Sequence, residues 1–122
     1  MAKILVVEQH QSLGELYRLI LKQFAHEVTV VTSWKLGLAL TQKHSFQLII
    51  LDLATPDHRA LAQLQASGIP ERIPVILTTS LGESEIRDLI APIKFAAALF
   101  KPFSVGDLLI VIQHLLPTTD QE

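Results

Sequence analysis

Residues 47–56 read QLIILDLATP, an apolar run that ends on a carboxylate. Four consecutive apolar residues, two of them β-branched, predict a short strand over 47–51 that is buried on both faces, as in the middle of a parallel sheet. Asp52 would then lie at the carboxyl end of this strand, the edge at which open α/β sheets bind their ligands. The carboxylate could be a nucleophile, a metal ligand or simply the first polar residue of a turn.

Similar apolar runs alternate with helical patterns along the chain. The other predicted strands are 4–7, 27–31, 75–78 and 96–100, and the predicted helices are about 12–25, 33–43, 58–65 and 83–90, with a last helix that Ser104 caps and Pro117 ends. In the first helix, the apolar residues that recur at helical spacing are Leu13, Leu16, Ile20 and Phe24. Because each crossover is right-handed and about one helix long, this order predicts a doubly wound α/β fold, a mostly parallel (βα)5 sheet with helices on both faces.

Composition limits the possible functions. At 122 residues the chain is long enough for one domain with a proper core, predicted to span 1–117 and to be followed by a polar tail at 118–122. A net charge of -2 argues against direct nucleic-acid binding, and the absence of cysteine excludes disulfides and thiolate chemistry. No apolar run approaches the roughly 20 residues that cross a membrane. The first apolar block is also too short for a signal peptide, so a cytoplasmic location is expected.

Polar residues follow four of the predicted strands. They are Glu8 with Gln9, Asp52, Thr79 and Lys101. In a parallel sheet these strand ends share one edge, so carboxylates, a hydroxyl and an ammonium group should converge there. Such a set suits phosphoryl transfer to a carboxylate: an aspartate attacks phosphorus, a divalent metal neutralises the phosphoryl oxygens, and the hydroxyl and lysine hold those that remain.

Nearly the whole chain resembles the receiver domain of two-component response regulators. The resemblance is carried by KILVV at 3–7, Leu51-Asp52-Leu53 with Pro56-Asp57, IPVIL at 73–77 before Thr79-Ser80, and FKPF at 100–103. It implies a flavodoxin-like fold with strand order 2-1-3-4-5 and a cis peptide bond at Lys101-Pro102.

The same resemblance implies a role for each site residue. Asp52 would accept a phosphoryl group from a histidine kinase or a phosphotransfer protein. Thr79 would be the switch hydroxyl that binds the phosphoryl group, and Lys101 would pair with it. A Mg²⁺ ion would be held by Glu8 after the first strand, by Asp52 and by the backbone carbonyl of Ala54.

Two departures from the receiver pattern bear on function. The usual pair of acids is Glu8-Gln9 here, and Gln9 offers only a neutral oxygen, so we expect Gln9 to be a weak or absent ligand, with weaker Mg²⁺ binding and slower phosphoryl transfer. Receivers typically place an aromatic residue three positions before the lysine, where its rotamer follows the switch hydroxyl. That position is Ala98, which cannot flip.

Two functions therefore remain open. The chain could be a phosphoaccepting receiver that signals to a downstream protein through its fourth helix, fifth strand and fifth helix. It could instead be an atypical pseudo-receiver, a protein-interaction module that works without phosphorylation. Neither function implies enzyme activity beyond phosphorylation and dephosphorylation of Asp52. A haloacid dehalogenase-type phosphatase is rejected, because it needs a second aspartate where this chain has Ala54.

Overall fold

The computed structural model describes residues 2–116, which form five strands, five α-helices and one short 3-10 helix. The strands are β1 (Lys3–Val7), β2 (Glu27–Val31), β3 (Leu48–Leu53), β4 (Val75–Thr79) and β5 (Ala97–Phe100). The helices are α1 (Gln11–Lys22), α2 (Trp34–Thr41), α3 (His58–Ser67), α4 (Glu83–Ile90) and α5 (Val105–Leu115), with the 3-10 helix at Ile69–Glu71. All ten predicted elements are present, with ends shifted by a few residues. The predicted tail at 118–122 lies outside the described residues.

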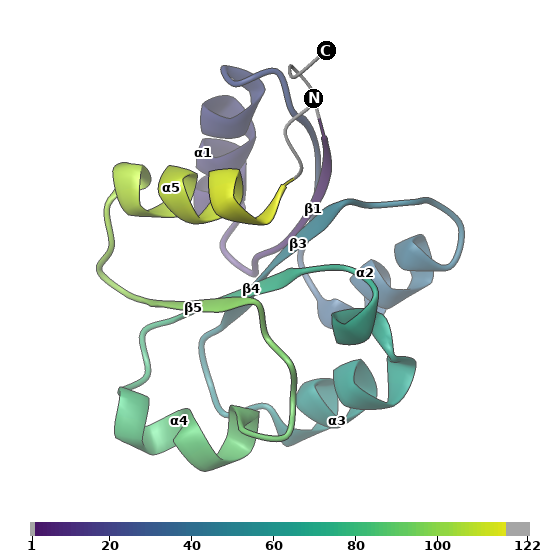
Figure 1. Ribbon diagram of the computed structural model, residues 1–122, viewed down its shortest axis with the longest axis vertical. Helices are drawn as coiled ribbons and strands as arrows, with labels where there is room; N and C mark the ends of the chain where they lie inside the picture. The colour runs from purple at the N-terminus through teal and green to yellow at the C-terminus, as the bar shows by residue number, and fades with distance from the viewer. Residues whose placement is uncertain (1, 117–122) are drawn as a thin grey trace.

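The five strands form one parallel sheet in the order β2-β1-β3-β4-β5. Helices α1 and α5 cover one face of the sheet, and α2, α3 and α4 cover the other (Figure 1). This arrangement confirms the predicted flavodoxin-like, doubly wound fold and its strand order. The predicted cis peptide bond at Lys101-Pro102 is also confirmed.

The central strand β3 is buried on both faces, as its apolar run predicts. Leu48 and Ile50 pack into the core under α1 and α5, whereas Ile49 and Leu51 pack into the core under α2, α3 and α4. Side chains alternate between faces because successive residues of a strand point to opposite sides. The same alternation decides on which face each polar residue at a strand end emerges.

Gly14 lets helix α1 lie close to the sheet. A β-carbon at Gly14 would come within 2.7 Å of Val30 Cγ1 on β2, so any other residue would require Val30 or the helix to move. The contact sets the rotation of α1 about its axis. As a result the line of residues that faces the sheet is Gly14, Tyr17 and Leu21.

Candidate functional site

Four polar side chains gather at the carboxyl ends of the strands, on the α1–α5 side of the sheet. They are Glu8, Asp52, Thr78 and Lys101. Each lies two residues after a side chain that packs into the core under α1 and α5, namely Val6, Ile50, Ile76 and Leu99. The period of two therefore sends all four toward the same face. The predicted convergence of carboxylates with an ammonium group at this edge is present in the structure.

Lys101 is the counter-charge for two buried carboxylates. Its Nζ lies 2.7 Å from Asp52 Oδ1 and 4.0 Å from Glu8 Oε1. The side chains of Asp52 and Glu8 are 3% and 0% exposed, whereas that of Lys101 is 26% exposed. Two carboxylates buried this deeply would be unfavourable without a cation, so Lys101 is both a structural and a functional partner of the site.

The hydroxyl that contacts Asp52 belongs to Thr78. Its Oγ1 donates to Asp52 Oδ1 at 2.9 Å, and the two residues are paired across β3 and β4. Thr78 was not predicted, because the sequence analysis selected Thr79, the polar residue that follows the predicted strand 75–78. The alternation of side chains along a strand could have identified Thr78. Asp52 follows Ile50 by two residues and Thr78 follows Ile76 by two, so both point to the same face as these core residues.

The predicted switch residue, Thr79, points to the opposite face of the sheet. Its Oγ1 donates to the Leu53 carbonyl at 2.6 Å and accepts from the Leu81 N–H at 3.1 Å. The side chain is fully buried. Thr79 is therefore held away from the Asp52 carboxylate, and it would have to break the bond to Leu53 to reach a phosphoryl group.

One carboxylate oxygen of Glu8 accepts a hydrogen bond, whereas the other lacks one. Its Oε2 accepts from the backbone N–H of His10 at 3.1 Å, and the His10 ring Nδ1 lies at the same distance. Within residues 2–116, its Oε1 is buried and has no hydrogen-bond partner. A buried acceptor left unpaired is unfavourable, which marks this atom as a place for a cation.

The other predicted metal ligands line a small recess next to Asp52. Gln9, Asp52 and Ala54 contribute to this cavity of about 40 Å³, together with Trp34 from α2. In the described part of the chain, no group of three histidine or acidic side chains is placed to hold a metal. The two carboxylates, one amide oxygen and one backbone carbonyl are all hard oxygen donors, the kind that Mg²⁺ binds.

Tyr17 lies directly behind this group. It is 5% exposed. Burial raises the pKa of Tyr17 to about 12, and the negative charges of Glu8 and Asp52 also raise it, while the nearby hydroxyl of Thr78 acts in the opposite direction. Tyr17 thus keeps its proton at all pH values at which the fold is expected to be stable.

The shifted pKa of Tyr17 predicts a loss of stability in alkali. The pKa is about 12 in the folded chain and about 10 in an unfolded chain. The neutral phenol is favoured by folding, so its contribution is fully present below about pH 10 and is lost as the pH rises through about 12, a difference of about 3 kcal/mol.

The measurement is simple because the chain has a single tyrosine. We expect phenolate absorbance to appear in the native protein well above the pH at which it appears in denaturant. A native midpoint near that of the denatured chain would show that Tyr17 is not buried as described.

Known proteins with similar sequences or folds agree with this geometry. Residues 4–113 match the family model described as the response regulator receiver domain. The chain is 29% identical, over 124 aligned residues, to the response regulator ArlR of Staphylococcus saprophyticus, an alignment that covers 100% of this chain and 56% of ArlR. The chain therefore spans about half the length of the curated relatives that it matches.

Two solved structures illustrate the similarity of the fold. The chemotaxis protein CheY4 of Vibrio cholerae superposes with a TM-score of 0.82 at 25% identity, over 95% of this chain and 99% of CheY4. The receiver domain of the sensor histidine kinase PA1611 from Pseudomonas aeruginosa superposes with a TM-score of 0.79 at 20% identity, over 93% and 96% of the two chains. The latter structure has a magnesium ion coordinated in its active-site cleft. Between residues 2 and 116, no helix of the present chain is long and apolar enough to cross a membrane.

Proposed function

The chain belongs to the response regulator receiver domain family, and from this membership we propose that Asp52 accepts a phosphoryl group from a histidine kinase or a phosphotransfer protein. The observation that carries the proposal is the 2.7 Å contact between Lys101 Nζ and Asp52 Oδ1 at the carboxyl edge of the sheet. A lysine there lies beside the carboxylate and is already in place for the charge of an incoming phosphoryl group.

In the proposed reaction, a carboxylate oxygen of Asp52 attacks the phosphorus atom of the donor. A bond from Asp52 to phosphorus forms as the bond from phosphorus to the donor atom breaks, and the donor leaves with that electron pair. Thr78 and Lys101 both bind Oδ1, so we assign the attack to Oδ2. Lys101 then moves from the carboxylate, whose charge is lost, to an oxygen of the phosphoryl group.

The residues at this edge also fit a Mg²⁺ ion. The buried, unpaired Oε1 of Glu8 supplies the observation, because a cation would satisfy it. We propose that Glu8, Asp52 and the backbone carbonyl of Ala54 hold the ion, with Gln9 as a weak or absent ligand. When bound, Mg²⁺ neutralises charge on the phosphoryl oxygens. Because Gln9 carries no charge, the proposal includes weaker Mg²⁺ binding than two adjacent acids would give.

For the downstream partner we propose the face formed by α4, β5 and α5. A cavity of about 380 Å³ opens between α4 and β5, and its walls include Arg87, Ile90 and Ala98. A protein would bind there rather than DNA or a membrane, since the chain has a net charge of -2. A cytoplasmic location belongs to the same proposal, because phosphoryl donors derived from ATP are found there.

One observation favours a second function. Gln9 lacks the negative charge of the acid that receivers typically use to bind the metal. Ala98 lacks the aromatic side chain that they typically carry on the fifth strand. An atypical pseudo-receiver, which binds a partner protein without being phosphorylated, would tolerate both changes. The two functions differ in one measurable property, namely whether Asp52 takes up a phosphoryl group.

Reaction with acetyl phosphate distinguishes a phosphoaccepting receiver from a pseudo-receiver. The protein is incubated with this donor in the presence of Mg²⁺ or of a chelator, and its intact mass is followed over time. We expect the wild type to gain one phosphoryl group only with Mg²⁺, and Asp52→Asn to gain none. Asp88→Asn is the matched control, since Asp88 is an exposed acid on α4 and does not line the recess beside Asp52. No gain in the wild type would favour the pseudo-receiver.

A further inference from the structure

Helix α1 carries apolar side chains on the side that faces away from the sheet. Leu16 and Leu19 are 48% and 61% exposed. Because they are three positions apart, they lie on the same side of the helix. A helix that covers a sheet usually places polar residues on its outer side, where they contact water. The two leucines are therefore an exception that the packing of this chain does not require.

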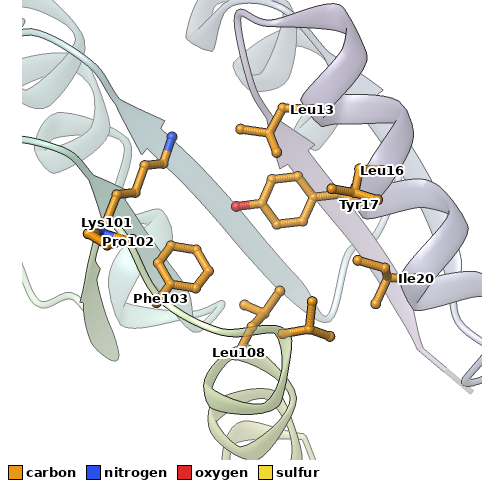
Figure 2. Close-up of a pocket in the computed structure, with 9 residues that line it drawn as sticks. Leu13, Leu16, Tyr17, Ile20, Lys101, Pro102, Phe103 and Leu108 are labelled. Atoms are coloured by element: carbon orange, nitrogen blue, oxygen red, sulfur yellow. The ribbon is translucent and has the colours of Figure 1, made fainter.

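The apolar surface continues from these leucines across to α5. Leu16 also lines an apolar cavity of about 320 Å³ between α1 and the segment that leads into α5. Figure 2 shows Leu16 and Ile20 on the α1 side of this cavity and Phe103 on the other side. Val105, in the first turn of α5, lines the cavity as well and is 46% exposed. The leucines and the cavity thus form one apolar surface, of the kind that binds another protein.

Charged residues of opposite sign lie along one flank of this surface. Glu15 and Lys22 are both exposed. They are seven positions apart, about two helical turns, so they lie on the same flank of the leucine pair. Arg18 donates to the Val28 carbonyl and to Glu15 Oε1, yet the Glu15 side chain is still 59% exposed. The flank is therefore acidic near the start of α1 and basic near its end.

We propose that this surface binds a second copy of the chain, with the two α1 helices packed antiparallel about a twofold axis. Such an axis brings the same surface of both copies together. The midpoint of Leu16 and Leu19 and the midpoint of Glu15 and Lys22 are one residue apart in the sequence, which is about 1.5 Å along the helix. One axis therefore places Leu16 against Leu19 of the second copy and Glu15 beside Lys22 of the second copy, and each contact occurs twice.

The order of the charges favours a second copy over another protein. A flank with an acid at one end and a base at the other is complementary to itself when the helices are antiparallel, whereas a parallel pair would bring like charges together. The net charge of -2 adds little repulsion between copies. Exposed ion pairs contribute little to affinity, so the leucines supply most of it and the charges set the orientation. The inference does not depend on phosphorylation of Asp52.

The first test removes the apolar contact. Sedimentation equilibrium of the chain measures its dimerisation constant, and we expect Leu19→Ala to weaken dimerisation at least about tenfold, because two copies of Leu19 lose their burial. Leu36→Ala is the matched control and should leave the constant unchanged. Leu36 is 53% exposed but lies on α2, on the opposite face of the sheet (Figure 1).

Two results of this experiment would overturn the inference. The first is a wild type that stays monomeric up to about 1 mM, the weak end of specific association, as expected if a different protein occupies the surface. The second is a dimer that Leu19→Ala weakens no more than Leu36→Ala does, which would place the interface elsewhere.

The second test reverses the charges. Glu15→Lys and Lys22→Glu each bring like charges together in the antiparallel pair, so each variant alone should dimerise about threefold to tenfold more weakly. An equal mixture of the two variants should recover the wild-type constant, because every lysine then lies beside a glutamate of the other chain. Recovery would also show that both variants are folded.

The matched control for the mixture is Glu71→Lys combined with Lys22→Glu. Glu71 is exposed on the 3-10 helix that follows α3, away from α1, so this mixture has the same total charge but keeps Glu15 beside a glutamate at one of the two contacts. It should dimerise more weakly than the mixture that contains Glu15→Lys. Equal dimerisation in the two mixtures, or no recovery in either, would contradict the antiparallel pairing.

Discussion

Lys101→Met is expected to lower the free energy of unfolding by about 3 kcal/mol and to slow phosphorylation of Asp52 by at least about tenfold. The reason is the burial of Asp52 and Glu8, whose side chains are 3% and 0% exposed and share this one nearby ammonium group among the described residues. Removing one partner leaves uncompensated charge inside the protein, and it also removes the cation that would receive the phosphoryl oxygens. Urea denaturation gives the first quantity and intact-mass kinetics the second.

Adding Asp52→Asn to Lys101→Met should restore part of the lost stability but not phosphorylation. With Asp52 neutral, Lys101→Met leaves only Glu8 without its cation, so the double mutant should be more stable than Lys101→Met alone. Lys94→Met provides the matched control, because Lys94 is exposed and lies on the loop before β5. If Lys101→Met and Lys94→Met unfold at the same urea concentration, Lys101 does not compensate the buried carboxylates in solution.

Gln9→Asp is expected to tighten Mg²⁺ binding by about thirtyfold. A carboxylate about 4 Å from a divalent cation gains about 2 kcal/mol even in a medium as polar as water, which corresponds to this ratio of affinities. Gln9 is exposed and lines the same recess as Asp52 and Ala54, so an added charge there would be close to the ion.

Trp34 offers a direct readout of this titration. It lines the recess, and it is the only tryptophan in the sequence. Gln11→Asp is the control, because it adds the same charge at an exposed position in the first turn of α1. Equal midpoints for wild type and Gln9→Asp would show that Gln9 does not face the metal, and the weakened site would then need another explanation.

The fold could be predicted from the sequence because its strongest signals are local. The apolar run at 48–51 allowed only a strand buried on both faces, and the alternation of strands and helices then left a parallel sheet with right-handed crossovers. The grouping of Asp52 with Lys101 followed directly, since parallel strands end at one edge.

The rotation of α1 could not be predicted in the same way. Apolar spacing selected the line through Leu16 and Phe24, yet these residues are 48% and 50% exposed. The helix is instead turned so that Gly14 faces Val30, a contact between elements distant in sequence. This rotation turns Tyr17 toward the sheet, although the apolar spacing did not select it.

The identity of the threonine that contacts Asp52 was predicted incorrectly. Thr79 was selected for its place at the end of the strand, whereas Thr78 contacts Asp52 because both lie on the α1–α5 side. Successive residues of a strand point to opposite faces of the sheet, so residues two positions apart share a face. This information is present in the sequence. Whether Thr79 turns toward a phosphoryl group after its bond to Leu53 breaks stays a prediction.

The most direct test of the account is to locate the phosphoryl group itself. After reaction with acetyl phosphate and Mg²⁺, borohydride reduces an aspartyl phosphate to homoserine, and peptide mass spectrometry then identifies the converted residue. We predict homoserine at residue 52 in the wild type and at no position in Asp52→Asn. Homoserine at another aspartate, or unmodified Asp52 after complete reaction, would contradict the assignment of Asp52 as the phosphoacceptor.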